Sequence, residues 1–382
     1  MSRTIMRAAA LLVALFAAAS LSAFDWGVTI DNSSTLEIGE WTDNDTEVQR
    51  DKVSLWAEHF WTGSGDARYR VLGNVYYLFT DERAFLVDAD LLKFEMIRPN
   101  TAGGAVMDLS LGRFRFSDST GVVLNHGADG ALLGLDYSAV RISAGAGYTG
   151  LQLKPESNVD MSAADLADGE DDDIHFAPKR LFEVLTIGFP EFLPRQRFAV
   201  EAILQQDLRT EDTLDSAHVI ARLDGALGGG FYYDLSGAAA MNLSDDVQDV
   251  MAGGTLRWFA ESFYGSRASA GFLLAGEDFF AISEPTLGLV FNPDPADILR
   301  LSVDYSLRPW AGRFSPALRN LQFAAGAKFF MLSDGTWGGT ELEGGINFRP
   351  SHDFGASVKA GAWMPDEGDF QGLVRFDVSI GL

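Results

Sequence analysis

The sequence predicts an all-β fold, a single transmembrane antiparallel up-and-down β-barrel of about 16–18 strands. Segments along the whole chain alternate apolar and polar residues with a period of two, as β-strands do. After the N-terminal region, no apolar run approaches the roughly 20 residues that a membrane-spanning helix needs. The chain also ends in an alternating segment, 370–382, whose apolar face continues to the last residue.

Residues 1–23 have the features of a secretory signal peptide. Two arginines precede an apolar stretch, and small residues then permit cleavage after Ser22 or Ala23. We therefore expect an exported protein whose mature part is one domain, 24–382. Because the chain has no cysteine, it is neither a lipoprotein nor a disulfide-stabilised fold.

The composition suits a barrel. The chain has 40 glycines in 382 residues and 12 % aromatic residues, and glycine is more frequent than the usual ~7 %. Soluble all-β proteins share part of this profile. A soluble periplasmic all-β binding protein, with its apolar faces packed on each other, therefore remains the alternative architecture.

Several internal segments alternate clearly. The clearest is 298–307, where leucine, valine and tyrosine oppose arginine, serine and aspartate, and 321–331 and 354–364 repeat the pattern. We also interpret 285–291 as a strand. Clusters of Gly, Pro, Asp and Asn, such as 333–335, separate the segments at short intervals and indicate turns. The spacing continues to the C-terminus and predicts one meandering domain.

The final segment carries a family resemblance. Phe376, Val378 and Ile380 fall on its apolar face, and Arg375 and Asp377 on its polar face. The segment resembles the last strand of bacterial outer-membrane β-barrel proteins, although it ends in leucine where those proteins have an aromatic residue. The resemblance implies an outer-membrane location, contact with outer-membrane lipid, and recognition of this strand by the barrel-assembly machinery.

The segment around residues 111–121 is the most distinctive. Arg113 and Arg115 share one face, Phe114 and Phe116 share the other, and Asp118 follows. The stretch that begins here is similar to predicted outer-membrane barrels of spirochaete-type bacteria. In porins, such residues would imply a charged lumen or constriction. A salt-bridge ladder that merely stiffens the wall is an equally good interpretation.

These patterns predict a porin-like channel for small hydrophilic solutes. We expect the lumen to be lined by Arg113, Arg115, Asp118, Asp304, Lys359, Arg375 and Asp377. With 54 acidic against 29 basic residues, we expect an open pore to favour cations, unless the two arginines reverse the sign at a narrow point. A closed barrel that serves as a surface scaffold or adhesin is the alternative, and a transporter of hydrophobic solutes is a third reading.

The longest stretch without periodicity is the acidic loop 152–178. Its acidic residues include Asp168, Glu170, Asp171, Asp172 and Asp173. The main expectation is a solvated extracellular loop, and the functional alternatives are cation or Ca²⁺ binding or folding into the pore. Counting strands backwards from the C-terminus places this loop on the periplasmic side instead. One segment between the loop and the C-terminus is therefore wrongly divided.

Nothing in the sequence favours catalysis, a metal or a cofactor. The five histidines are scattered and never have the spacing of a metal site. Residues 145–150 match the glycine pattern of a nucleotide-binding loop, but no helix can follow because Pro155 comes soon after. A net charge of −25 makes nucleic acid an unlikely partner. The oligomeric state is not predicted.

Overall fold

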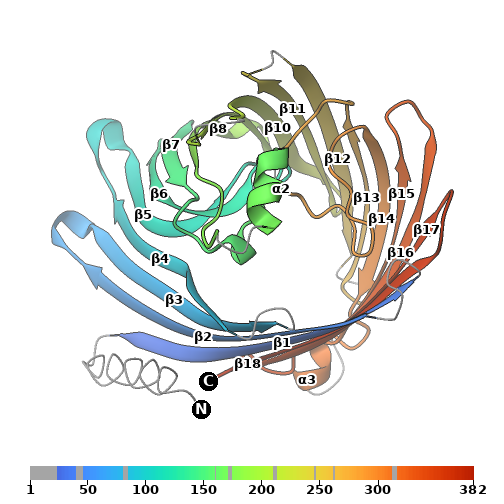
Figure 1. Cartoon of the computed structure of the whole chain (residues 1–382). Helices are drawn as coiled ribbons and strands as arrows, with labels where there is room; N and C mark the ends of the chain where they lie inside the picture. The colour runs from blue at the N-terminus through green and yellow to red at the C-terminus, as the bar shows by residue number, and fades with distance from the viewer. Residues whose placement is uncertain are drawn as a thin grey trace.

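The computed structural model describes residues 24–39, 46–80, 85–159, 161–170, 174–209, 213–244, 247–260, 263–311 and 316–382. The proposed signal peptide lies outside these residues. Within them, eighteen antiparallel strands form one sheet in which each strand pairs with its neighbours in sequence. The last strand, β18, also pairs with the first, β1, so the sheet closes into a barrel (Figure 1). This confirms the predicted all-β barrel.

The strands are β1 (Asp25–Gly39), β2 (Thr46–Thr62), β3 (Arg68–Thr80), β4 (Leu86–Arg98), β5 (Val106–Ser117), β6 (Asn125–Asp136), β7 (Arg141–Tyr148), β8 (Arg180–Leu193), β9 (Gln196–Asp207), β10 (Ser216–Gly228), β11 (Phe231–Asn242), β12 (Gln248–Ala260), β13 (Ser266–Ala275), β14 (Ile298–Leu307), β15 (Gln322–Met331), β16 (Trp337–Phe348), β17 (Phe354–Pro365) and β18 (Gln371–Gly381).

Helical structure in the described residues is short. The elements are η1 (Ser64–Asp66), η2 (Ala102–Gly104), η3 (Lys154–Glu156), α2 (Ala163–Glu170) and α3 (Pro316–Arg319). None of these helices is long and apolar enough to cross a membrane.

The outer face of the wall is apolar because the strands alternate. In β14, Leu301 and Val303 are 40 % and 54 % exposed and point outward, whereas Ser302 and Asp304 point to the lumen. Aromatic rings also gather on β2, β3 and β4, where Trp61 stacks on Tyr69 with 5.4 Å between ring centroids. Exposed apolar bands and aromatic rows of this kind are typical of barrel walls that contact lipid.

An even number of antiparallel strands puts both ends of the sheet at the same rim. We call this the terminal rim, and the opposite one the far rim. The connection between β7 and β8, 149–179, contains the acidic loop. This connection and the loop between β13 and β14, 276–297, both lie at the far rim. The backward count that placed the acidic loop at the terminal rim is therefore wrong.

Two strand assignments from the sequence are also wrong. Residues 285–291 form no strand and belong to the loop 276–297, and β16 escaped prediction. The apolar residues of 285–291 alternate because they are buried inside the barrel. Phe291 stacks on Trp363 of β17, with ring centroids 4.1 Å apart. In β16, glycines and glutamates occupy many of the positions at which apolar residues would have marked a strand.

Three loops of the far rim fold into the lumen, and we call them together the plug: 118–124, the described parts of 149–179, and 276–297. Figure 1 shows α2, which belongs to the second loop, inside the ring of strands. Backbone hydrogen bonds connect the loops: Ile282 N donates to Val123 O (2.7 Å), and Glu284 N donates to Asn158 O (2.8 Å). The plug thus forms one connected body.

The plug has an apolar core together with the inner face of the wall. Val123 and Leu124 of the first loop and Ile282 of the third are at most 1 % exposed, and they belong to the same buried cluster as Phe182 and Ile220 of the wall. Residues that face the lumen of a membrane barrel are usually polar. Here the wall is apolar on the side that the plug covers, which leaves the passage on the other side.

Candidate functional site

Four cavities of 450–600 Å³, formed by described residues, lie in the part of the interior that the plug leaves free. Cavity A (570 Å³) lies between the plug and β2–β5, and cavity B (450 Å³) lies against β1, β2 and β16–β18. Cavity C (520 Å³) lies between the plug and β13–β17, and cavity D (600 Å³) lies near the terminal rim. Arg50 and Lys52 line both A and B, and Asn347 lines both B and C. The first three cavities are therefore connected through shared side chains.

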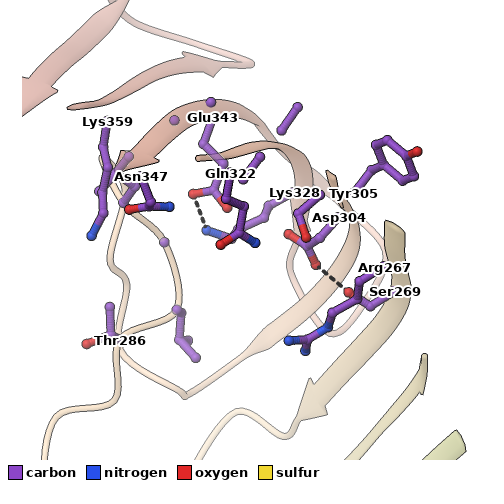
Figure 2. Close-up of a pocket in the computed structure, with 18 of the residues that line it drawn as sticks. Arg267, Ser269, Thr286, Asp304, Tyr305, Gln322, Lys328, Glu343, Asn347 and Lys359 are labelled. Atoms are coloured by element: carbon purple, nitrogen blue, oxygen red, sulfur yellow. Dashed lines mark hydrogen bonds and ion pairs between the residues drawn. The ribbon is translucent and has the colours of Figure 1, made fainter. Parts of the chain in front are cut away.

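Cavity C contains two of the residues predicted to line the pore. Asp304 of β14 accepts a hydrogen bond from Ser269 at 3.3 Å, and Lys328 of β15 pairs with Glu343 of β16 at 2.9 Å (Figure 2). Lys359 of β17 lies near Asn347 in the same view. Within the described part of the chain, Lys359 has no ion-pair partner. The cavity therefore offers an ammonium group together with mixed polar groups.

Cavity B contains two more predicted residues. Arg375 of β18 donates to Asp377 at 2.7 Å, and Asp377 also accepts hydrogen bonds from Ser33 and Ser357 at 2.8 and 2.9 Å. In the β17–β18 register, Arg375 stands directly opposite Lys359. The structure thus brings Asp304, Lys359, Arg375 and Asp377 onto one continuous stretch of the lumen lining.

Cavity A lies between the wall and the plug. Arg50 of β2 forms an ion pair with Glu156 of the plug at 3.3 Å. Lys52 pairs with Asp90 of β4 at 2.5 Å, and its ammonium group lies 3.9 Å from the ring centre of Tyr76. The predicted Arg115 also lines this cavity, where it donates to Asn125 at 2.5 Å.

The Glu156 side chain is largely shielded from solvent. Its side chain is 17 % exposed, whereas that of Arg50 is 50 % exposed. Burial raises the pKa of the Glu156 carboxyl above its usual value, although nearby Arg50 and Lys52 act in the opposite direction. The ion pair therefore joins a shielded carboxylate to a guanidinium that water reaches.

Cavity D is the most basic of the four. Its charged residues are Arg197, Arg222, Arg257, Arg308 and Asp224. Arg197 pairs with Asp224 at 2.5 Å, and Arg222 pairs with Asp234. Among the described residues, Arg257 and Arg308 have no acidic partner, so the lining has a local excess of positive charge.

Arg113 does not line any of the four cavities. Strands β4 and β5 pair only as far as Leu92 and Arg113, although both continue toward the far rim. We call this unpaired stretch the seam. The Arg113 side chain, 8 % exposed, fills the seam and donates to Asp88 at 2.7 Å and to Asp129 at 2.9 Å. It also donates to the carbonyl oxygens of Ala89 (3.2 Å) and Leu151 (2.9 Å).

Asp118 organises a loop and is 5 % exposed. Its carboxylate accepts hydrogen bonds from the backbone N–H groups of Thr120, Gly121, Val123 and Leu124, at 2.6, 3.1, 3.0 and 2.7 Å, and from the Thr120 hydroxyl at 2.5 Å. This carboxylate therefore holds the loop 118–124 in its inward position and has no free acceptor directed at the passage.

The acidic loop is anchored by charge. Asp165 at the start of α2 and Arg180 of β8 are both fully buried at the side chain and pair at 2.6 Å, and Arg180 also lies 3.3 Å from Asp207. Asp168 pairs with Arg209 at 3.5 Å. The side chain of Glu170, and Asp171, Asp172 and Asp173 altogether, lie outside the described residues. The part that is described is folded into the barrel, which was one of the alternatives for this loop.

Two histidines hold the plug to the wall. His126 of β6 contacts the Ser157 hydroxyl at 3.2 Å, and His218 of β10 contacts the carbonyl oxygen of Phe280 at 3.2 Å. In the described residues, no group of three or more His, Asp or Glu side chains is arranged to hold a metal ion. No residue constellation here identifies a cofactor site.

Sequence reasoning missed Arg50 and Lys52, which stand where cavities A and B meet. The signal was present, because two basic residues at a spacing of two share one face of a strand. The arginines of cavity D come from separate strands, and only the sheet register brings them together.

The fold is similar to that of several solved structures from Pseudomonas aeruginosa. Pseudomonas aeruginosa OccK3 (OpdO) is 15 % identical, with a TM-score of 0.65 over 94 % of this chain and 96 % of that one. P. aeruginosa OccK11 (OpdR) is 10 % identical, with a TM-score of 0.67 over 94 % and 96 %. P. aeruginosa OccK2 (OpdF) is 10 % identical, with a TM-score of 0.66 over 94 % and 97 %.

The shared property is the fold. At these identities, the likeness does not extend to a solute or to a particular residue. No protein-family model and no curated protein sequence matches the chain. The resemblance to spirochaete-type barrels gains no support from the three structures named above and stays a prediction.

Proposed function

We propose that the protein is an outer-membrane channel for small hydrophilic solutes. The observation that carries this proposal is the set of cavities along one side of a closed eighteen-strand barrel. They are lined by charged side chains, several of which have no ion-pair partner in the described part of the chain. The apolar outer face supports insertion into lipid. The likeness to solved porins supports the same location and class.

The cavity linings favour anionic over cationic solutes. They contain thirteen Arg or Lys and eight Asp or Glu: Arg50, Lys52, Arg115, Arg197, Arg222, Arg257, Arg267, Arg300, Arg308, Lys328, Lys359, Arg349 and Arg375, against Asp31, Asp88, Asp90, Glu156, Asp224, Asp304, Glu343 and Asp377.

The sequence alone predicted a cation preference because acidic residues exceed basic ones along the chain. Many of these acids belong to the far-rim loops; the turn 366–370 has Asp366, Glu367 and Asp369. Charges at a narrow passage act on a solute more strongly than charges at a wide, hydrated mouth, where salt screens them. We therefore propose selectivity for small anions, in place of the preference inferred from net charge.

The plug favours a second candidate, a closed barrel that serves as a surface scaffold. Its apolar core and buried ion pairs fix it against one side of the wall. The channel remains the better proposal because a purely structural filling would not leave Lys359, Arg257 and Arg308 facing the interior without an acidic partner among the described residues.

Conductance of the refolded protein in a planar bilayer tests the proposal. We expect stepwise conductance and, across a KCl gradient, a reversal potential of anion-selective sign. Arg257→Gln should reduce this selectivity, whereas Arg98→Gln, which removes the same charge outside the four cavities, should not. Absence of steps would favour the scaffold, and a cation-selective reversal potential would restore the inference from net charge.

A further inference from the structure

Arg50 and Lys52 mark the junction between cavities A and B. They are the only two described residues that line both cavities. A solute that passes from A to B must therefore pass these two side chains. Lys52 is occupied by Asp90 and by the Tyr76 ring, which leaves Arg50 as the more accessible cation at the junction.

Glu156 reaches Arg50 from the plug. It ends the short helix η3, and its Oε1 lies 3.3 Å from Nη2 of Arg50. Among the ion pairs of the described residues, this one joins the plug to β2, on the opposite side of the passage from β8 and β9, where α2 is anchored. The pair thus spans cavity A.

The backbone that carries Glu156 is fixed. Leu153 N donates to Asp88 at 3.0 Å, Lys154 N donates to the carbonyl oxygen of His175 at 3.1 Å, and Ser157 contacts His126. Only the side chain of Glu156 has to rotate for the pair to separate. With Arg50 half exposed, such a pair contributes little stability and exchanges readily with ions from solution.

We propose that the Glu156 carboxylate is a resident counter-anion at Arg50, which a permeating anion must displace, so that this pair sets the anion selectivity of the junction. The inference rests on the proposed channel function. The carboxylate occupies the position that a solute anion would take beside the guanidinium, and it repels that anion until it moves aside. Protonation of Glu156 removes both effects.

Reversal potentials in KCl gradients test this, with chloride as the probe anion. Glu156→Gln should raise the permeability of chloride relative to potassium about two- to five-fold, the scale of one unit charge acting over several ångströms in partly hydrated surroundings. Glu284→Gln is the matched control, because it removes the same charge from an exposed position on the plug. Glu156→Asp keeps the charge with a shorter reach, and it should fall between the wild type and Glu156→Gln.

The pH dependence of the chloride preference separates this role of Glu156 from a purely structural one, which would not change the selectivity with pH. The wild-type chloride preference should increase as pH falls and Glu156 is protonated, and Glu156→Gln should remove most of this increase. The charged or titratable groups around Glu156 are Arg50, Lys52, Tyr76, Asp88, Asp90 and Arg115. Asp88 and Asp90 remain in the variant, so they contribute equally to both curves.

The outcomes separate the two proposals. A wild type without any conductance would overturn the channel function. A conducting wild type whose chloride preference and pH profile match those of Glu156→Gln would overturn the counter-anion role alone. Heat-modifiable mobility of each variant on gels verifies that the barrel has folded before its conductance is interpreted.

Discussion

Replacing Arg113 by alanine should destabilise the wall at the seam between β4 and β5. The side chain is 8 % exposed and serves two carboxylates and two carbonyl oxygens, and no strand pairing replaces it there. Removing one partner of a buried ion pair typically costs 3–5 kcal/mol. Because Asp88 and Asp129 are 14 % and 25 % exposed, water can partly solvate them. We expect a loss at the lower end, about 3 kcal/mol.

Urea unfolding of the refolded barrel in lipid vesicles, followed by tryptophan fluorescence, measures this loss. Arg115→Ala is the matched control, because Arg115 lies two residues along the same strand, is exposed and, among the described residues, donates only to Asn125. The free energy of unfolding of Arg115→Ala should differ from that of the wild type by no more than about 0.5 kcal/mol. Equal losses for the two variants, or an unchanged free energy of unfolding for Arg113→Ala, would refute the view that Arg113 closes the seam.

Four further predictions concern the plug, its contact with the wall, and one turn. Glu341→Ala should free the loop 276–297 for limited proteolysis of the intact barrel, because the fully buried carboxylate accepts the N–H groups of Leu289, Val290 and Phe291 at 2.8–3.0 Å; a cleavage pattern like that of the wild type would contradict this. Arg180→Met should lower the free energy of unfolding by about 3 kcal/mol, because Asp165 and Asp207 lose one buried cation and keep only their pairs with Arg209, and an unchanged urea midpoint would argue against it. The pKa of Glu156 is higher in the folded than in the unfolded protein, because the carboxyl group is buried. Protonated Glu156 therefore stabilises the fold at a pH below the unfolded-state pKa, and this stabilisation is lost as pH rises through the folded-state pKa. The urea midpoint of Glu156→Gln should therefore fall less with rising pH than that of the wild type. For Asp334 the pH dependence is reversed. The N–H of Thr336 donates to its carboxylate and lowers its pKa, so the stability that Asp334 contributes is lost as pH falls. The urea midpoint of Asp334→Asn should therefore decline less in acid than that of the wild type.

The strand pattern was readable because lipid and lumen impose opposite polarity on successive residues. The segments 298–307 and 354–364 coincide with β14 and nearly with β17. Alternation did not identify strands correctly where the plug, and not water, fills the lumen. In 285–291, alternation reflects burial of Phe291 against Trp363 inside the barrel, and the local sequence is the same whether lipid or a plug supplies the apolar surroundings.

The candidate site was only partly predictable. Asp304, Lys359, Arg375 and Asp377 could be placed on the polar face of regular strands. Arg113 could not be distinguished from them, because its partners Asp88 and Asp129 are 25 and 16 residues away and only the folded sheet brings them near. The local sequence does indicate the structural role of Asp118, because Asp followed by Ser-Thr-Gly is typical of a turn in which the aspartate side chain accepts backbone N–H groups.

The closing pair of strands also governs how the wall can be assembled. Every other pair joins strands that are consecutive in sequence, whereas β1 and β18 join residues about 350 positions apart, such as Ile30 and Ile380. Loop closure entropy grows only logarithmically, so this one contact costs about 4 kcal/mol more than a four-residue hairpin. Val28 and Leu382 exchange backbone hydrogen bonds of 3.0 and 2.8 Å. The hydrogen-bonded wall is thus a closed ring of strands, and between β18 and β1 only the covalent chain is interrupted. A circular permutant that joins these ends and opens the turn after β10 would have the same ring, cut elsewhere.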